Sequence, residues 1–134
     1  RRRREIIGRY DAALHPLGVE TLPHYTAEHE SSGHLYITRV PGITPEQRNT
    51  LIEQMAERGI ACNVHYKPLP LLTAYKQLGF SIEDYPHAYA RFANEITLPL
   101  HTRLTDEAVA YIIDNYRELL QAMPAGGTDK CANC

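Results

Sequence analysis

The sequence predicts an α+β fold, in which a small sheet of three or four strands is packed with helices. Apolar residues recur at helical spacing near the start, before the middle and near the end of the chain, and short apolar or alternating runs lie between them. Elements in this mixed order pack as layers around one core. A length of 134 residues is enough for one such domain and too short for two well-buried ones.

Composition narrows the class of protein. The chain is 43% hydrophobic and 22% charged, with a formal net charge of −2, as in ordinary globular proteins. Arg1 to Arg4 form a basic run, but Arg1 and Glu5 can pair across one helical turn, so a solvated helix end explains the run better than a nucleic-acid arm. No apolar run approaches the roughly 18 residues that span a bilayer. We therefore expect a cytoplasmic protein with no nucleic-acid or membrane partner.

The first elements have clear boundaries. Apolar spacing predicts a helix over residues 2–14, which Pro16 ends, and a short edge strand over 19–22. Alternation predicts a strand over 34–40, which Pro41 stops. The apolar stripe of the first helix comprises Ile6, Ile7, Tyr10, Ala13 and Leu14.

The next helix has the best-marked start in the chain. Thr44 and Gln47 have the spacing of a capping box, and Pro45 occupies the first helical position, where its missing N–H costs nothing. Gly59 ends this helix. The apolar run over residues 60–66 predicts another strand of the sheet, packed directly on the helix through the short connection.

The second half alternates short helices with one strand. We expect helices over residues 71–78 and 87–94, a strand over 95–100, and a final helix that Thr105 caps. The final helix has a continuous apolar face, consisting of Val109, Ile112, Ile113, Tyr116, Leu119, Leu120 and Met123.

The domain is expected to cover residues 1–123, followed by a mobile tail over 124–134. The tail contains Cys131 and Cys134, which could be half of a zinc knuckle or a redox pair, although no second cysteine pair accompanies them. The chain starts without methionine, inside what reads as a helix already under way. We therefore expect a fragment of a longer chain.

Three polar side chains with different chemistries lie together at the end of the predicted strand 60–66. His65, Tyr66 and Lys67 follow one another, and Pro68 and Pro70 then forbid continuation of the strand. A strand end is a place where a scaffold presents side chains to a ligand. The alternative is a core histidine, a core aromatic ring and a solvated lysine.

The order and spacing of several short motifs resemble the C-terminal domain of the DegT/DnrJ/StrS family, pyridoxal-phosphate (PLP) dependent aminotransferases of nucleotide-linked keto-sugars. The likeness covers almost the whole chain. It is carried by the first helix, His34-Leu-Tyr36 with Arg39-Val40, Gly59-Ile60, His65-Tyr66-x-Pro68, Tyr75-x-x-Leu78-Gly79, and Leu98-Pro-Leu-His101 with Leu104-Thr105.

The resemblance implies a role for the His65–Tyr66 segment, which in the family lines the active-site cleft near the sugar nucleotide. On this basis the expected substrate-binding residues are His65, Tyr66, Lys67, Pro68, Leu69 and His101. Many members have a second histidine where this chain has Pro70, which leaves the identity of the sugar open.

The resemblance also implies that the catalytic centre lies elsewhere. Lys67 precedes a proline, and no Gly/Ser/Thr-rich anion loop accompanies it, so it is not expected to be the Schiff-base lysine. In the family that lysine belongs to a large N-terminal PLP domain, and the enzymes are homodimers. We therefore expect no catalytic residue and no bound PLP in this fragment, which alone would be inactive. In the full enzyme we expect amino transfer, from glutamate, to a nucleotide sugar in polysaccharide biosynthesis.

Two other interpretations remain open. The chain could be a free-standing α+β ligand-binding or regulatory module, because small domains of this kind serve many roles. His24, His29 and His34 recur at five-residue intervals, but this spacing places side chains on no common face and matches no catalytic zinc motif. A metal site is therefore not expected.

Overall fold

The computed structural model describes residues 1–123, and their fold is α+β as predicted. Helices and strands are mixed along the chain, with short 3₁₀ turns between some of them. The α-helices are α1 (Arg2–Leu14), α2 (Pro45–Glu57), α3 (Thr73–Gln77), α4 (Pro86–Ala93) and α5 (Asp106–Ala122). The 3₁₀ turns are η1 (His15–Leu17), η2 (Leu69–Leu71) and η3 (Ile82–Asp84). The strands are β1 (Glu20–Thr21), β2 (Tyr36–Arg39) and β3 (Glu95–Leu98).

The strands form one antiparallel sheet in the order β1-β2-β3. In β2, Tyr36 and Thr38 are buried while Ile37 and Arg39 are half-buried on the other face, as a two-residue period requires. All four residues of β3 are buried. Strand β3 therefore has side chains packed on both of its faces, although it lies at the edge of the sheet.

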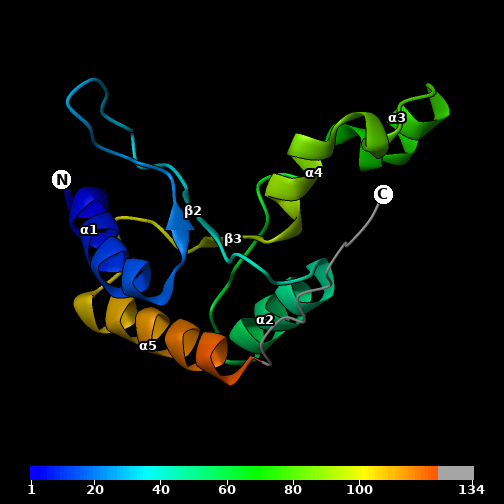
Figure 1. The fold of residues 1–134 in the computed structure, drawn as a ribbon. Coiled ribbons are helices and arrows are strands. Elements are labelled where there is room, and N and C mark those ends of the chain that lie inside the picture. Colours follow the sequence, from blue (N-terminus) through cyan, green and yellow to red (C-terminus); the bar gives the residue numbers. More distant parts are fainter. Residues whose placement is uncertain (124–134) are drawn as a thin grey trace.

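Helices α1, α2 and α5 cover one side of the sheet, and α5 contacts both of the others (Figure 1). The Thr38 hydroxyl donates to the Ile96 carbonyl at 2.6 Å and accepts from the Tyr116 hydroxyl at 3.0 Å, which ties α5 to the sheet. The largest fully buried side chains are Tyr10, Tyr36, Tyr116, Ile6, Ile7, Leu14, Leu51, Met55, Ile96, Leu98 and Val109. These residues include four of the five predicted for the stripe of the first helix. In α5 the buried residues are Val109, Ile112, Ile113, Tyr116 and Leu119, which all belong to the predicted apolar face.

The strand predicted over residues 60–66 is wrong. Only Asn63 pairs with β3, through an isolated bridge to Thr97, and the chain then leaves the sheet at His65. The side chain of Glu95 takes the backbone N–H of His65 at 2.8 Å, in place of the backbone carbonyl that a strand would use. The other strands are present, although β2 and β3 are shorter than predicted.

Residues 69–93 form an arm that projects from the body of the fold (Figure 1). None of η2, α3, η3 and α4 contains a buried residue. Large apolar side chains of this arm are nevertheless exposed to solvent: Leu69, Leu72, Leu78, Phe80, Tyr85 and Tyr89. The arm therefore presents a surface that suits a packing partner.

The capping box of α2 gives a direct test of the local fold. Thr44 accepts from the N–H of Gln47 through its hydroxyl, and the Gln47 side chain accepts from the N–H of Thr44. Replacing Thr44 with Ala removes one of these bonds and should lower the free energy of unfolding by about 1 kcal/mol. Thr44→Ser keeps the hydroxyl and should cost much less. Equal losses in the two variants, measured by urea unfolding, would contradict the cap.

Candidate functional site

A hollow of about 180 Å³ lies between the sheet, α4 and the His65–Tyr66 segment. Its walls combine apolar side chains with ionisable ones. The lining residues are Leu22, Ile37, Arg39, His65, Tyr66, Ala88, Arg91, Phe92 and Glu95. This hollow is the place where the described residues bring a histidine, a carboxylate and two guanidinium groups together.

Glu95 anchors the segment that bears His65. Its side chain is buried, and one carboxylate oxygen accepts from the backbone N–H of His65 at 2.8 Å while the other accepts from the Thr97 hydroxyl at 2.6 Å. Burial raises the pKa of Glu95, and the bonds from Thr97 and His65 oppose this shift because they favour the ionised carboxylate.

The sheet register explains why this contact forms where it does. Asn63 and Thr97 exchange both backbone hydrogen bonds, so the next hydrogen-bonded pair of an antiparallel ladder would be His65 and Glu95. The carbonyl of Glu95 instead accepts from the Arg48 guanidinium at 3.2 Å. The Glu95 side chain thus replaces its own backbone as the acceptor for His65, and the chain diverges from β3 at this pair.

Arg48 lies beneath β3 and is itself buried. Its guanidinium donates to the carbonyls of Phe92 and Glu95 and to the side chain of Asn49. The same guanidinium lies 4.7 Å from the centre of the Phe92 ring, a cation–π distance. Burial lowers the pKa of Arg48, but a guanidinium stays protonated in proteins. Arg48 therefore fixes the connection between α4 and β3 to helix α2.

His65 and Tyr66 face the hollow from its mouth. Their rings pack edge to face with centres 4.7 Å apart, and the peptide bond between them is cis. The Nδ1 atom of His65 is buried without a hydrogen-bond partner among the described residues. The side chain of Tyr66 is 72% exposed, so Tyr66 does not belong to the core that residues 1–123 form. An imidazole and an exposed aromatic ring that line the same hollow are suited to a polar ligand that offers a flat face.

Two arginines contribute positive charge. Arg39 of β2 pairs with Glu20 at 3.0 Å and donates to Asn94, which leaves part of its guanidinium toward the hollow. Arg91 of α4 has no carboxylate within salt-bridge distance among residues 1–123. Both also line a smaller adjoining hollow of about 80 Å³. Anionic groups would be attracted to this side of the molecule.

The structure brings together two of the residues predicted to bind substrate and separates the others from them. Lys67 and Leu69 are exposed, Pro68 is half-buried, and none of these three lines the hollow beside His65. His101 lies at a different hollow, between the end of β3 and α5. Of the predicted substrate-binding residues, His65 and Tyr66 line this hollow, and Arg39, Arg91 and Glu95 line it without having been predicted. The sequence did contain a signal for Glu95, because it is an acidic residue at the start of a largely apolar strand. A carboxylate that is buried in a strand needs hydrogen-bond partners, which indicates a specific contact.

The described residues do not fit PLP as its principal binding site. The cofactor requires a lysine with a lowered pKa and a phosphate cradle. Lys67 and Lys76 are exposed, and no lysine lines the hollow beside His65. The buried carboxylate there is already engaged by His65 and Thr97. Lys130, Cys131 and Cys134 lie outside the described residues, as does the whole predicted tail.

The histidines near the N-terminal half make separate local contacts. His24 stacks on Tyr36 and bonds Ser31, whereas His29 contacts the Pro23 carbonyl and Thr26. Burial lowers the pKa of His24. Within residues 1–123 no group of three or more His, Cys, Asp or Glu side chains is placed to hold a metal ion.

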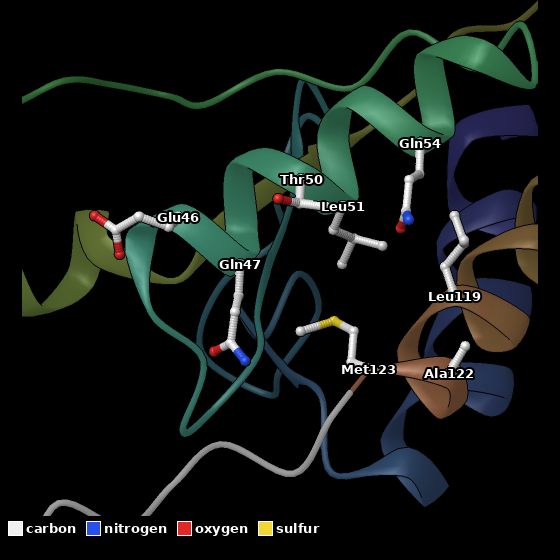
Figure 2. A pocket seen from close by; sticks show the side chains of 8 residues that line it. All are labelled: Glu46, Gln47, Thr50, Leu51, Gln54, Leu119, Ala122 and Met123. Atoms are coloured by element: carbon white, nitrogen blue, oxygen red, sulfur yellow. The ribbon is translucent and has the colours of Figure 1, made fainter.

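A larger hollow, of about 330 Å³, lies between α2 and the end of α5 (Figure 2). The side chains of Leu51, Leu119 and Met123 face it, with the amides of Gln47 and Gln54 nearby, while the carboxylate of Glu46 points away (Figure 2). It contains no pair of titratable groups that could act together. Its size alone does not make it a catalytic site.

Comparison with known proteins identifies the family. Residues 1–117 match the DegT/DnrJ/EryC1/StrS aminotransferase family, so the chain belongs to it. PLP is the cofactor of this family. The match confirms the resemblance that the short motifs predicted, and it includes all of those motifs.

The similar proteins include sugar aminotransferases. The spore coat polysaccharide biosynthesis protein SpsC of Bacillus subtilis is 28% identical over 126 residues, which cover 90% of this chain and 32% of SpsC. A dTDP-4-dehydro-2,3,6-trideoxy-D-glucose 4-aminotransferase of Saccharopolyspora spinosa is 31% identical, over 90% of this chain and 30% of that enzyme. The chain thus spans about a third of the length of these relatives.

Solved structures agree. Spr1654 of Streptococcus pneumoniae, described as a sugar aminotransferase and solved in a PLP form, superposes with a TM-score of 0.87 and 56% identity. That match covers 90% of this chain and 31% of Spr1654. The aminotransferase TlmJ of Streptoalloteichus hindustanus has a TM-score of 0.79 and 32% identity, over 92% of this chain and 32% of TlmJ. Among residues 1–123 there is no helix both long and apolar enough to cross a membrane.

The raised pKa of Glu95 predicts how stability depends on pH. The folded state holds the proton of Glu95 more tightly than the unfolded chain, whose glutamates titrate near about pH 4.3. The contribution of Glu95 is therefore greatest below that pH and is lost as the pH rises through the raised value. Relative to the original protein, Glu95→Gln should gain stability as the pH increases from about 4 to 8.

Urea unfolding of both proteins at several pH values checks this expectation, because the other carboxyl groups are common to the two and cancel. A stability difference that is independent of pH, or that changes in the opposite direction, would contradict the assignment of a raised pKa.

Proposed function

We propose that this chain is the C-terminal part of a PLP-dependent aminotransferase that transfers an amino group, from glutamate, to a keto-sugar carried on a nucleotide. The hollow beside His65 and Tyr66 is, in this proposal, the part of the substrate cleft that the chain supplies. The observation that carries the proposal is the position of these two residues at a charged hollow, within a chain that matches sugar aminotransferases over 90% of its length.

The charge and shape of the hollow support a nucleotide sugar. Its diphosphate is anionic, and the guanidinium groups of Arg39 and Arg91 offer charge-assisted hydrogen bonds to such a group. The exposed ring of Tyr66 can pack against a sugar or base, and the imidazole of His65, which lines the hollow, can bond a hydroxyl. In this proposal, the side chains that line the hollow bind and orient the substrate. None is assigned a proton-transfer role.

The rest of the enzyme holds the cofactor in this proposal. PLP supplies the electron sink of amino transfer. The described residues form no phosphate cradle beside a lysine, and relatives contain about three times the length of this chain. The arm over residues 69–93 supports the same view, since its exposed apolar side chains suit packing against the large PLP domain or the second subunit of a homodimer.

Substitutions at the hollow test the substrate role in the full-length enzyme. His65→Ala and Tyr66→Ala should each lower kcat/KM by an amount equivalent to about 1–3 kcal/mol, since each removes a contact with bound substrate. Val64→Ala is the control, because Val64 precedes them, is half-buried and does not line the hollow. It should affect melting temperature more than kcat/KM. Unchanged kcat/KM with a large loss of stability in His65→Ala and Tyr66→Ala would show that these residues belong to the core and do not bind substrate.

Labelling with PLP tests the division of labour between the parts of the enzyme. After incubation of this chain with PLP and reduction with borohydride, no single lysine should be labelled stoichiometrically, because no phosphate cradle accompanies Lys67 or Lys76 in the described residues. Peptide mass spectrometry measures the labelling of each lysine. Specific, stoichiometric modification of Lys67 would show instead that this chain holds the cofactor.

A further inference from the structure

We propose that Glu95 is the positioning residue of the substrate cleft: its carboxylate holds the His65–Tyr66 segment away from the sheet and so keeps the hollow open. This role rests on the proposed function, in which the His65–Tyr66 segment binds the substrate. Glu95 itself would act on the backbone of His65 and not on the substrate.

The contact between Glu95 and His65 lies where the pairing with β3 would otherwise continue. Asn63 is bonded to Thr97 through both backbone groups, and two residues later the ladder would bond His65 to Glu95. The carboxylate intercepts that N–H at 2.8 Å. An acceptor on a side chain holds the partner backbone farther from β3 than a carbonyl would. The space between His65, β3 and α4 is the hollow.

The two carbonyls of β3 that face this segment already have donors of their own. The carbonyl of Glu95 accepts from Arg48 at 3.2 Å, and the carbonyl of Thr97 accepts from Asn63 at 3.2 Å. Without the carboxylate, the N–H of His65 would lose its partner, and an unsatisfied N–H is costly where water has poor access. The segment should therefore become mobile rather than join the sheet.

The carboxylate of Glu95 is itself held in one place. Glu95 is 4% exposed and its second oxygen accepts from the Thr97 hydroxyl at 2.6 Å. Arg48 fixes the backbone on the other side of the same residue. The carboxylate of Glu95 is buried, accepts hydrogen bonds through both oxygens and belongs to a strand of the sheet. It can therefore hold the backbone of His65 in one position.

Three variants of the full-length enzyme test the proposal. Glu95→Ala removes the acceptor, and Glu95→Gln keeps a side-chain oxygen that can accept from His65. Thr38→Val is the matched control, since it removes a buried hydroxyl from the neighbouring strand, where Thr38 bonds Ile96 and Tyr116, and Thr38 does not line the hollow. The measurements are steady-state kinetics for each substrate and amide hydrogen exchange of the peptide that contains residues 63–67.

Glu95→Ala should raise exchange in that peptide and raise KM for the nucleotide sugar at least about tenfold, with the KM for glutamate changed less than about threefold. Glu95→Gln should restore both quantities to within about threefold of the original values. Thr38→Val should lower the melting temperature without this KM difference. If Glu95→Ala does not fold, Glu95→Asp, which withdraws the carboxylate by one methylene group, should show the same changes.

Exchange and KM unchanged in Glu95→Ala, or changed equally in Thr38→Val, would overturn the proposal. So would failure of Glu95→Gln to restore them. The exchange measurement needs no substrate. If the enzyme proved inactive on nucleotide sugars, the proposed function would fail, and the exchange rates would still decide whether Glu95 holds the His65–Tyr66 segment.

Discussion

The hydrogen bond from the backbone of His65 to the buried carboxylate of Glu95 is the contact on which the candidate site depends. The carbonyl of Glu95 accepts from Arg48, while the side chain of the same residue accepts from His65. An antiparallel pair that would otherwise continue is thereby stopped after one bridge. A polar interaction inside the fold, rather than a loop insertion, separates the chain from the sheet and makes room for a ligand.

This arrangement depends in turn on the core. Helix α2 is fixed at its start by the Thr44–Gln47 capping box and contacts β3 through Arg48, while α5 is tied to the sheet through Tyr116 and Thr38. Buried polar groups are costly unless they are satisfied, and here each of these groups has a partner. The site is therefore built on a rigid base, and its exposed parts are the ring of Tyr66 and the arm that follows.

Local signals in the sequence predicted most of the fold because they act within a few residues. The box at Thr44, the stop at Gly59 and the apolar face of the last helix all produced the expected elements. The prediction of a strand over residues 60–66 was wrong because the pairing of this segment with β3 depends on Glu95 and Arg48, which are distant in sequence. The same reason explains why motif resemblance indicated His65 and Tyr66 while Arg39, Arg91 and Glu95 became apparent only in three dimensions.

The central claim is that the nucleotide sugar binds at the hollow beside His65. Tyrosine nitration of the full-length enzyme, with and without nucleotide sugar, tests it directly, because Tyr66 lines this hollow and Tyr111 lines the separate one near His101. Both rings are at least half exposed in this chain, at 72% and 51%. Bound nucleotide sugar should protect Tyr66 and leave the nitration of Tyr111 unchanged. Equal nitration of Tyr66 in both conditions, or protection of Tyr111 alone, would contradict it.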